Sequence, residues 1–289
     1  MDPTIVYFLS FLLSAFVILC LLCIPIVLCI IPIVIARRKY HNTSYYKSTK
    51  KSYWDFDKGT HGEYLLYERL QFLEQYGWKF LFNVYIPKRD GQTTEIDLLL
   101  ISPKGIFVIE SKNYSGWVLG DENETSWTQA FPNGERYEFY NPIKQNNGHI
   151  YHLKTFLNRD IPLYSIVAFS DRCTLKQIRV QSNDVYVTYY SNVHTVIDKI
   201  YNQTPTVYLN QDAIQNLYNT LYSYSQASDE RKYQHAESAY AARFASQLNC
   251  PLCGGRLTLR TTQQGKNKGS KFYGCSNFPQ CQYRQHIDL

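Results

Sequence analysis

Residues 95–112 have the sequence EIDLLLISPKGIFVIESK, which predicts two apolar strands joined by a tight turn. The central SPKG segment supplies the turn, so residues whose numbers add to 207 face each other in an antiparallel pair. In that register Asp97 lies opposite Glu110, and Glu95 lies opposite Lys112. Because side chains two positions apart point to the same face of a strand, this hairpin gathers three carboxylates and one ammonium group at its open end.

Opposed carboxylates on a hairpin repel each other, since their Cβ atoms are only about 5 Å apart. A divalent cation between them removes the repulsion, and hard oxygen ligands suit Mg²⁺ or Mn²⁺. Asp97 and Glu110 are therefore predicted metal ligands, and Lys112 is placed to stabilise developing negative charge. The competing interpretation is a solvated strand face with incidental charges. A one-residue slip in register would also separate the two acids.

An acidic residue outside the hairpin supports a functional site. A helix is predicted from Thr60 to about Gln75, and Glu63 shares the inward-facing stripe of Leu66 and Leu70. A carboxylate that points toward the core needs a partner. The spacing of Thr60 and Glu63 also fits a capping box, so Glu63 is compatible with either role or with both.

A second helix is predicted from Asn141-Pro142 to about Leu157, with Asn as its cap and Pro at its first position. Gln145 lies in the first turn and has an amide to offer to a phosphate or a water. His149 and His152 share the face of Gln145, but a surface or core role is favoured for both over catalysis.

The remaining elements predict an α/β fold, with a small mixed sheet flanked by helices. Further strands are predicted at 80–86, 117–119, 165–169 and 185–187, and weaker helices at 191–201 and 210–224.

Four motifs together resemble the nuclease-related domain (NERD) family over about residues 57–170. They are Gly59-x-x-Gly62-Glu63, Glu95-Ile96-Asp97, Gly105 to Lys112, and Asn141-Pro142-x-x-Gln145. The resemblance implies a restriction-endonuclease-like, PD-(D/E)xK core and metal-dependent phosphodiester cleavage. It implies Asp97 and Glu110 as metal ligands helped by Glu63, Lys112 as the catalytic lysine and Gln145 as a further site residue. Gln92-Thr93-Thr94 precedes Glu95, so the Pro-Asp pair is missing, a departure that NERD proteins generally share.

Four cysteines near the C-terminus have the spacing of a metal site, Cys250-x2-Cys253 followed by Cys275-x5-Cys281. Four thiolates satisfy tetrahedral Zn²⁺ and leave no open position, so the predicted zinc is structural. A disulfide interpretation is disfavoured because the predicted topology places the module in reducing cytoplasm.

This module resembles the C-terminal zinc ribbon of bacterial type I topoisomerases over about 40 residues, including the Gly274-Cys275-Ser276-Asn277 run. The resemblance implies binding of single-stranded DNA, by cations on phosphates and aromatic rings on bases. The alternative is that the aromatic residues only fill a small core. The candidate DNA-binding residues are Arg256, Arg260, Lys271, Phe272, Tyr273 and Phe278.

No charged side chain occurs from Ile5 to Ile35, a run longer than the roughly 20 residues that cross a bilayer. Arg37-Arg38-Lys39 follows, so the positive-inside rule predicts a single-pass anchor in the bacterial inner (cytoplasmic) membrane, with the N-terminus outside. A cleaved signal peptide fits less well, because the start has no basic region and the apolar run is too long.

The whole chain has 289 residues, a net charge of +6 and eight cysteines. Its 45% hydrophobic content excludes a wholly disordered chain, and the cysteine distribution disfavours a disulfide framework. The expected segments are an anchor at 1–39, a polar tether at 40–56, the NERD-like domain at 57–224, a linker at 225–247 and the zinc ribbon at 248–289.

Three functions remain open from the sequence. The first is a membrane-anchored, metal-dependent nuclease that acts on DNA. The second is a catalytically inactive, membrane-anchored DNA-tethering protein, which the intact acidic and lysine residues disfavour. The third, weaker interpretation is a membrane scaffold whose ribbon binds protein.

Overall fold

The computed structural model describes residues 3–52, 58–89, 91–228, 250, 253, 255–262 and 271–286, together with 230, 232 and 235. Some side chains within the helices and strands are also outside the described set. The chain divides into two units, of which the first comprises Met1–Ile86 and Thr94–Gln226. The second comprises Pro87–Thr93 and Ala227–Leu289. Most of the predicted linker at 225–247 lies outside the described residues.

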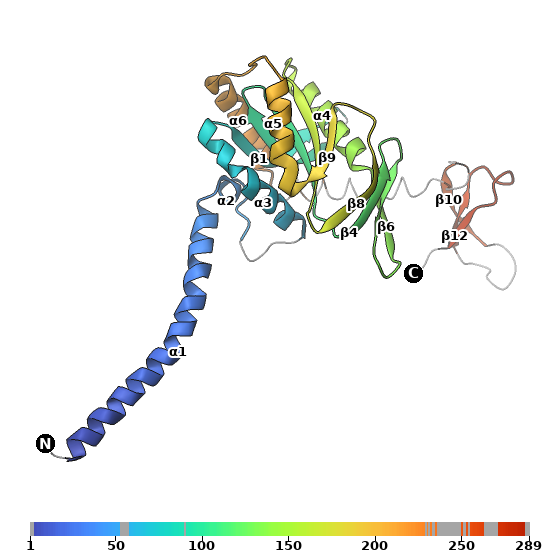
Figure 1. Cartoon of the computed structure of the whole chain (residues 1–289). Coiled ribbons are helices and arrows are strands. Elements are labelled where there is room, and N and C mark those ends of the chain that lie inside the picture. The colour runs from blue at the N-terminus through green and yellow to red at the C-terminus, as the bar shows by residue number, and fades with distance from the viewer. Residues whose placement is uncertain are drawn as a thin grey trace. The chain divides into compact units, whose positions relative to one another are not determined.

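The N-terminal segment forms helix α1 (Pro3–His41), drawn in blue in Figure 1. Most side chains between residues 5 and 27 are outside the described set. Among the residues that are described, no helix has the length and apolar character needed to cross a membrane. Membrane anchoring therefore stays a prediction.

The segment after α1 is packed, which differs from the polar tether predicted at 40–56. Residues Ser44–Thr49 form helix α2, and Tyr40 and Tyr45 are fully buried. The Tyr40 ring centroid lies 5.0 Å from that of Tyr64, on helix α3 (Lys58–Leu70). Tyrosine rings bury large apolar areas even in a segment of polar composition, and this burial docks the segment on the first unit. Residues 53–57 of the predicted tether are outside the described set.

The predicted mixed sheet is confirmed, with the order β1-β2-β3-β7-β9 (Figure 1). Strands β2 and β3 are antiparallel, whereas β3, β7 and β9 run parallel to one another. The strands are β1 (Lys79–Pro87), β2 (Thr93–Ser102), β3 (Gly105–Lys112), β7 (Leu163–Phe169) and β9 (Val185–Tyr189).

The predicted register of the β2–β3 hairpin is confirmed. The paired residues run from Ser102 and Gly105 at the turn to Leu98 and Ile109, and every pair adds to 207. The pairing ends there, one position short of the predicted pair of Asp97 and Glu110. Continuing the same register would place both acids on one face of the sheet, so their pairing stays a prediction.

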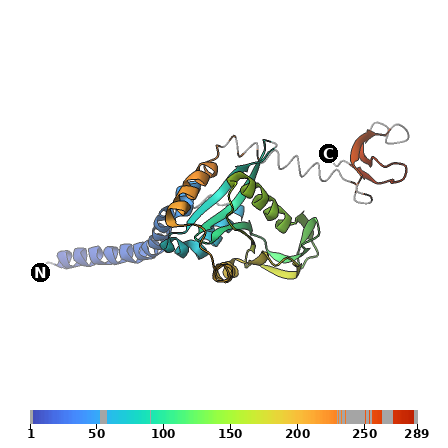
Figure 2. The ribbon, with the colours of Figure 1, turned by 90° about the horizontal axis from the view of Figure 1, so that it is seen from above.

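Helices cover both faces of this sheet (Figure 2). Helices α3 and α5 (Val193–Gln203) contribute apolar side chains to one face. Helices α4 (Pro142–Leu157) and α6 (Gln211–Ser225) contribute to the other, through residues such as Leu153 and Leu217. Short 3₁₀ helices follow α3 at Gln71–Tyr76 (η1) and β9 at Tyr190–Asn192 (η2).

A second sheet has the order β6-β5-β4-β8 and was mostly not predicted. Only β4 corresponds to an expected strand, at 117–119. The other three strands are short, and none of them buries a continuous apolar face that a sequence pattern would reveal. The strands are β4 (Gly116–Asp121), β5 (Ser126–Ala130), β6 (Arg136–Tyr140) and β8 (Cys173–Arg179).

Gly62 allows α3 to approach the end of β3 closely. A Cβ atom at this position would lie 2.6 Å from the Asn113 Cβ and 2.7 Å from the Tyr190 hydroxyl oxygen. Real Cβ atoms do not approach other heavy atoms so closely. The glycine therefore sets the position of the helix turn that carries Glu63.

We predict that Gly62→Ala destabilises the first unit by about 1–3 kcal/mol, because the added methyl group overpacks this contact. Gly148→Ala, on α4, is the matched control, since no atom lies within 4 Å of its added Cβ. It should be neutral or stabilise by about 0.5–1 kcal/mol through helix propensity. Denaturant unfolding followed by tryptophan fluorescence reports this unit, which holds all four tryptophans. Equal stabilities of the two variants would contradict the explanation.

Candidate active site

Strand β3 and helix α4 bring three of the predicted site residues together. Glu110 is buried, and its Oε1 lies 2.6 Å from Lys112 Nζ. Lys112 also donates to Gln145 Oε1 at 3.1 Å, so the first turn of α4 reaches the end of β3. The predicted cluster of acid, lysine and glutamine is therefore present in the structure.

Asp97 lies one position beyond the last backbone pair of β2 and β3, and its side chain accepts a hydrogen bond from the backbone of β3. Its Oδ2 accepts from the Ser111 amide at 2.8 Å, just past the last paired residues. Burial, followed by the nearby Glu110 and Glu63 carboxylates, raises the pKa of Asp97 well above its ordinary value. Asp97 is thus the member of the acidic pair whose ionisation is disfavoured by its surroundings.

Glu110 and Lys112 carry the complementary charges. Burial by itself would raise the pKa of Glu110, but Lys112 and then His149 outweigh it and lower this pKa to about 2. Burial likewise opposes the charge on Lys112, yet Glu110 and then Asp97 raise the pKa of its ammonium group. The site consequently combines one ion pair with a second acid whose pKa is raised.

Glu63 is held by residues that the sequence did not indicate. Its Oε2 accepts from Asn83 Nδ2 at 3.0 Å and from the Tyr45 hydroxyl at 3.3 Å. Burial raises the pKa of Glu63, although Lys51 and the Asn83 bond act in the opposite direction. Helix α3 begins before Thr60, so Thr60 is not at the N-cap position that the capping box requires.

Two further polar residues, Asn83 of β1 and Glu95 of β2, lie on the strands next to the site. Asn83 has a φ of 51° inside β1, a left-handed conformation that is uncommon for residues other than glycine. Glu95 was expected opposite Lys112, but its Oε1 accepts from the Tyr85 hydroxyl at 2.6 Å. Among the described residues, acidic and histidine side chains form no group of three with ligand atoms within 4.8 Å of one another.

His149 is the site residue that the sequence analysis passed over. It follows Gln145 by one helical turn and is buried. Its Nδ1 lies 2.7 Å from Thr94 Oγ1, and its Nε2 lies 3.2 Å from Glu110 Oε2. The four-residue spacing from Gln145 was the available signal, because residues four apart lie on one helix face.

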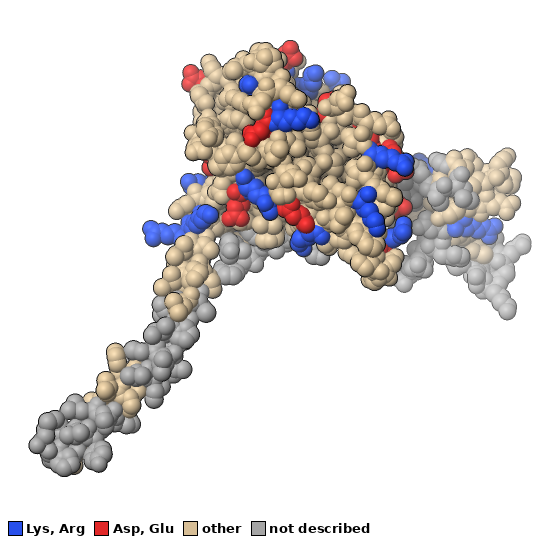
Figure 3. All heavy atoms as spheres, viewed as in Figure 1, with Lys and Arg blue, Asp and Glu red and all other residues tan. Residues whose placement is uncertain are grey.

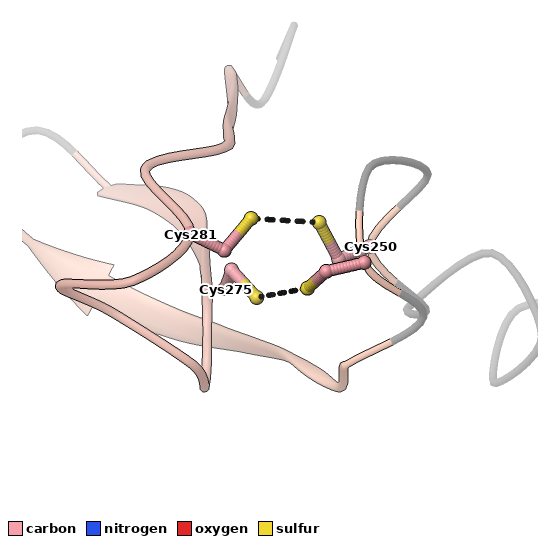
Figure 4. Close-up of side chains that lie close together, drawn as sticks. Cys250, Cys275 and Cys281 are labelled. Atoms are coloured by element: carbon pink, nitrogen blue, oxygen red, sulfur yellow. Dashed lines mark hydrogen bonds between the residues drawn. The ribbon is translucent and has the colours of Figure 1, made fainter.

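The four predicted zinc ligands converge in the second unit (Figure 4). The Sγ atoms of Cys250 and Cys281 are 3.5 Å apart, and those of Cys253 and Cys275 are 3.4 Å apart. All four lie within 4.8 Å of one another, as tetrahedral ligands of one Zn²⁺ do.

Asn277 supports these sulfur atoms from outside. Its backbone amide donates to Cys275 Sγ at 3.4 Å, and its Nδ2 donates to Cys253 Sγ at 3.5 Å. A Cβ atom on Gly255 would lie 2.7 Å from that Nδ2, so the glycine leaves room for the amide. Such outer hydrogen bonds orient metal ligands.

The candidate DNA-binding residues divide between the two faces of a three-stranded sheet. Strands β10 (Leu257–Thr261), β11 (Lys271–Cys275) and β12 (Arg284–His286) form this sheet. Tyr273 packs with the cysteine cluster, as the core-filling alternative predicts.

The other face carries two pairs of arginine and phenylalanine. The guanidinium carbon of Arg284 lies 5.5 Å from the Phe272 ring centroid, and that of Arg260 lies 5.7 Å from the Phe278 ring centroid. Arg256 is exposed, whereas the side chain of Lys271 is outside the described set. The candidates Arg260, Phe272 and Phe278 thus belong to pairs of a cation and an aromatic ring, the kinds of side chain by which proteins bind single-stranded nucleic acid.

Comparisons with known proteins agree with both parts of the chain. Residues 58–170 match the nuclease-related domain, and residues 247–288 match the topoisomerase DNA-binding C4 zinc finger. An uncharacterised protein of Bacillus anthracis is 34% identical over 164 residues, which cover 57% of this chain and 75% of that protein. The chain belongs to the nuclease-related domain family.

A more distant similarity covers a shorter stretch of the chain. The probable kinase PglW of Streptomyces coelicolor is 35% identical over 66 residues, which cover 23% of this chain and 4% of the kinase. No solved structure matches the chain. The nuclease-related domain and its zinc ribbon thus define a nuclease-like, DNA-binding protein.

We predict that Asp97→Asn changes how the stability of the first unit depends on pH when no magnesium or manganese is added. Above a pH of about 4 the unfolded chain loses the Asp97 proton before the folded chain does. Wild-type stability should therefore fall as the pH rises toward the raised native pKa, with a slope of up to about 1.4 kcal/mol per pH unit. Asparagine does not titrate, so the variant should lack this decline in denaturant unfolding. Parallel pH profiles would contradict the assignment.

We also predict that Cys253→Ser removes the zinc. The purified wild-type chain should contain about one zinc ion, because four thiolates complete one tetrahedral shell. The variant should contain close to none by elemental analysis. Cys173→Ala is the control, since Cys173 is a lone buried cysteine of β8, and it should keep the full zinc content.

Proposed function

We propose that the protein is a divalent-metal-dependent nuclease that cleaves phosphodiester bonds in DNA, and that its zinc ribbon binds single-stranded DNA. The observation that supports catalysis most directly is the buried ion pair of Glu110 and Lys112 beside a second acid, Asp97. Buried ionisable groups with strongly shifted pKa values are characteristic of active sites. The family match supports the same reaction class.

The chemistry of the acidic pair fits a divalent cation. Glu110 is buried, and its Oε2 lies 3.2 Å from His149 Nε2. Burial and then the Glu110 carboxylate raise the pKa of Asp97, and a bound cation would favour its ionised form. Asp97 and Glu110 would hold Mg²⁺ or Mn²⁺ with help from Glu63, as hard oxygen ligands do. A bound ion would polarise the scissile phosphate and acidify a water.

Lys112 and Gln145 would act on the phosphate. The Lys112 ammonium group, held by Glu110 and Gln145, is fixed in position to offset charge in the transition state. Its raised pKa keeps it charged at neutral pH. The reaction would leave a 5′-phosphate and a 3′-hydroxyl.

The ribbon would retain the substrate by its arginine and phenylalanine side chains. The first unit has no dominant basic surface on the face shown in Figure 3, where lysine and arginine are interspersed with acidic residues. The net charge of +6 over the whole chain is also modest. A dedicated DNA-binding module would compensate for this weak electrostatic attraction.

A second candidate function is a catalytically inactive DNA-tethering protein. It is favoured by the engagement of Glu63 with Asn83 and Tyr45, and by the lack of a three-ligand acidic group among the described residues. This function predicts DNA binding without cleavage by any variant.

We predict that the purified chain cleaves DNA only when Mg²⁺ or Mn²⁺ is added. Lys112→Ala should lower the rate by about 10²–10³-fold, because a preorganised charge is lost at the phosphate. Asp97→Ala should abolish measurable cleavage. Lys154→Ala, at an exposed position of α4, is the control and should retain the wild-type rate. DNA retention with no metal-dependent cutting by the wild-type chain would establish the tethering function instead.

We further propose that the N-terminal apolar segment anchors the protein in the bacterial cytoplasmic membrane, with both folded units in the cytoplasm. The support is the uncharged run from Ile5 to Ile35 followed by three basic residues. Wild-type protein should remain in the membrane pellet after alkaline carbonate extraction. A variant with Leu12→Lys, Leu13→Lys and Phe16→Lys should be released, because each central lysine costs about 2.5–3.5 kcal/mol of insertion energy. Release of the wild-type chain would refute the anchor.

A further inference from the structure

The segment that follows the N-terminal helix reaches one of the candidate active-site residues. The hydroxyl group of Tyr45, on α2, donates to the Thr60 carbonyl at 3.1 Å and to Glu63 Oε2 at 3.3 Å. Tyr45 and Glu63 are both buried. The match to the nuclease-related domain begins at residue 58, so Tyr45 adds to the site a side chain from outside the matched residues.

Aromatic packing fixes the position of the Tyr45 hydroxyl group. The Tyr45 ring lies edge-on to that of Phe82, with 4.8 Å between the centroids, and it stacks on the Tyr67 ring at 6.0 Å. The backbone of α2 is held as well, because the Ser44 amide donates to the Tyr67 hydroxyl oxygen at 3.2 Å. A side chain that is locked by packing can hold a functional group in one orientation.

A cation of the same segment lies near Glu63. Lys51 Nζ donates to Thr60 Oγ1 at 2.7 Å, about one helical turn before Glu63 on α3. Burial raises the pKa of Glu63, and Lys51 is the strongest of the influences that oppose this rise. The segment therefore provides Glu63 with both a hydrogen bond and a nearby positive charge.

The hydrogen bonds to Glu63 leave part of its carboxylate for the site. Tyr45 and Asn83 both donate to Oε2, and among the described residues no hydrogen bond engages Oε1. The charge of Glu63 also acts on the acidic pair, because burial, then Glu110 and then Glu63 raise the pKa of Asp97. A change in the orientation of Glu63 is therefore expected to alter the site.

We propose that the segment of residues 40–51 is part of the active site, and that Tyr45 is a positioning residue that orients the Glu63 carboxylate. The inference rests on the proposed function, in which Glu63 assists the two acids. It gives the segment a role beyond that of a spacer between α1 and the matched domain. The catalytic competence of the domain then depends on residues that precede it in the chain.

The test uses Tyr45→Phe in the full chain, which removes the hydroxyl group and keeps the packed ring. This variant should lower kcat for metal-dependent DNA cleavage by about 10–100-fold, as loss of a hydrogen bond that orients a functional carboxylate does. KM for DNA should change by less than about twofold, because a buried side chain makes no contact with the substrate. Tyr67→Phe is the matched control. It removes another buried hydroxyl group between α2 and α3, one that does not contact Glu63, and should retain the wild-type kcat.

A second background distinguishes positioning from packing. Tyr45→Phe should cause little further loss in a Glu63→Gln chain, because a positioning residue acts only through the group that it holds. A purely structural contribution would lower kcat by the same factor in both backgrounds.

Labelling the glutamate side-chain carboxyl groups with ¹³C gives a measurement that needs no DNA. The nuclear magnetic resonance signal of Glu63 is identified by its loss in Glu63→Gln. It should shift in Tyr45→Phe and keep its position in Tyr67→Phe.

The outcomes separate this inference from the proposed function. An unchanged kcat in Tyr45→Phe, equal losses in Tyr45→Phe and Tyr67→Phe, or losses that add to that of Glu63→Gln would overturn the inference and leave the nuclease intact. A wild-type chain that cleaves no DNA would refute the nuclease, and the carboxyl signal would then decide the inference. A shift confined to Tyr45→Phe would support the connection between the segment and Glu63, whereas equal or absent shifts would overturn it.

Discussion

The open end of the β2–β3 hairpin brings the carboxylates of Asp97 and Glu110 near each other. The ammonium group of Lys112 is the positive charge that interacts with both. In a medium of low dielectric two adjacent negative charges are costly, so the pKa of Asp97 is raised while Glu110 pairs with Lys112. Hydrophobic packing alone gives no reason to retain such a cluster. The surrounding elements are arranged so as to hold it in place.

Helix α4 provides most of that support. Asn141 caps the helix by accepting hydrogen bonds from the amides of Ile143 and Lys144. Asn146 is fully buried and donates to the Val108 carbonyl at 3.0 Å and to Ser165 Oγ at 2.9 Å, which joins the helix to β3 and β7. With its start and middle fixed, the helix presents Gln145 to Lys112 and His149 to Glu110.

The zinc ribbon solves a different physical problem, because its small sheet cannot bury a large core. Its apolar cluster consists of three of the cysteines and Leu257, with two tyrosines packed against them, and a metal ion would close it: Cys250, Cys275, Cys281, Leu257, Tyr273 and Tyr283. The arginine and phenylalanine pairs on the opposite face are therefore not needed for the core. On β11 the two-residue period of a strand thus separates Phe272, a residue proposed to bind DNA, from Tyr273, which packs in the core.

Short-range sequence patterns were sufficient to predict several elements of this protein. The turn after Ser102 fixed the hairpin register, Asn141-Pro142 fixed the start of α4, and the cysteine spacing identified the cluster, since each depends only on residues close in the chain. Only the tertiary structure decided which side chains meet across long separations. Thr94 contacts His149, and Glu63 contacts Asn83 in its left-handed conformation. The packing of α2 and the second sheet had the same non-local origin: tyrosine burial in the first and pairing of short polar strands in the second are set by surfaces that the rest of the fold provides.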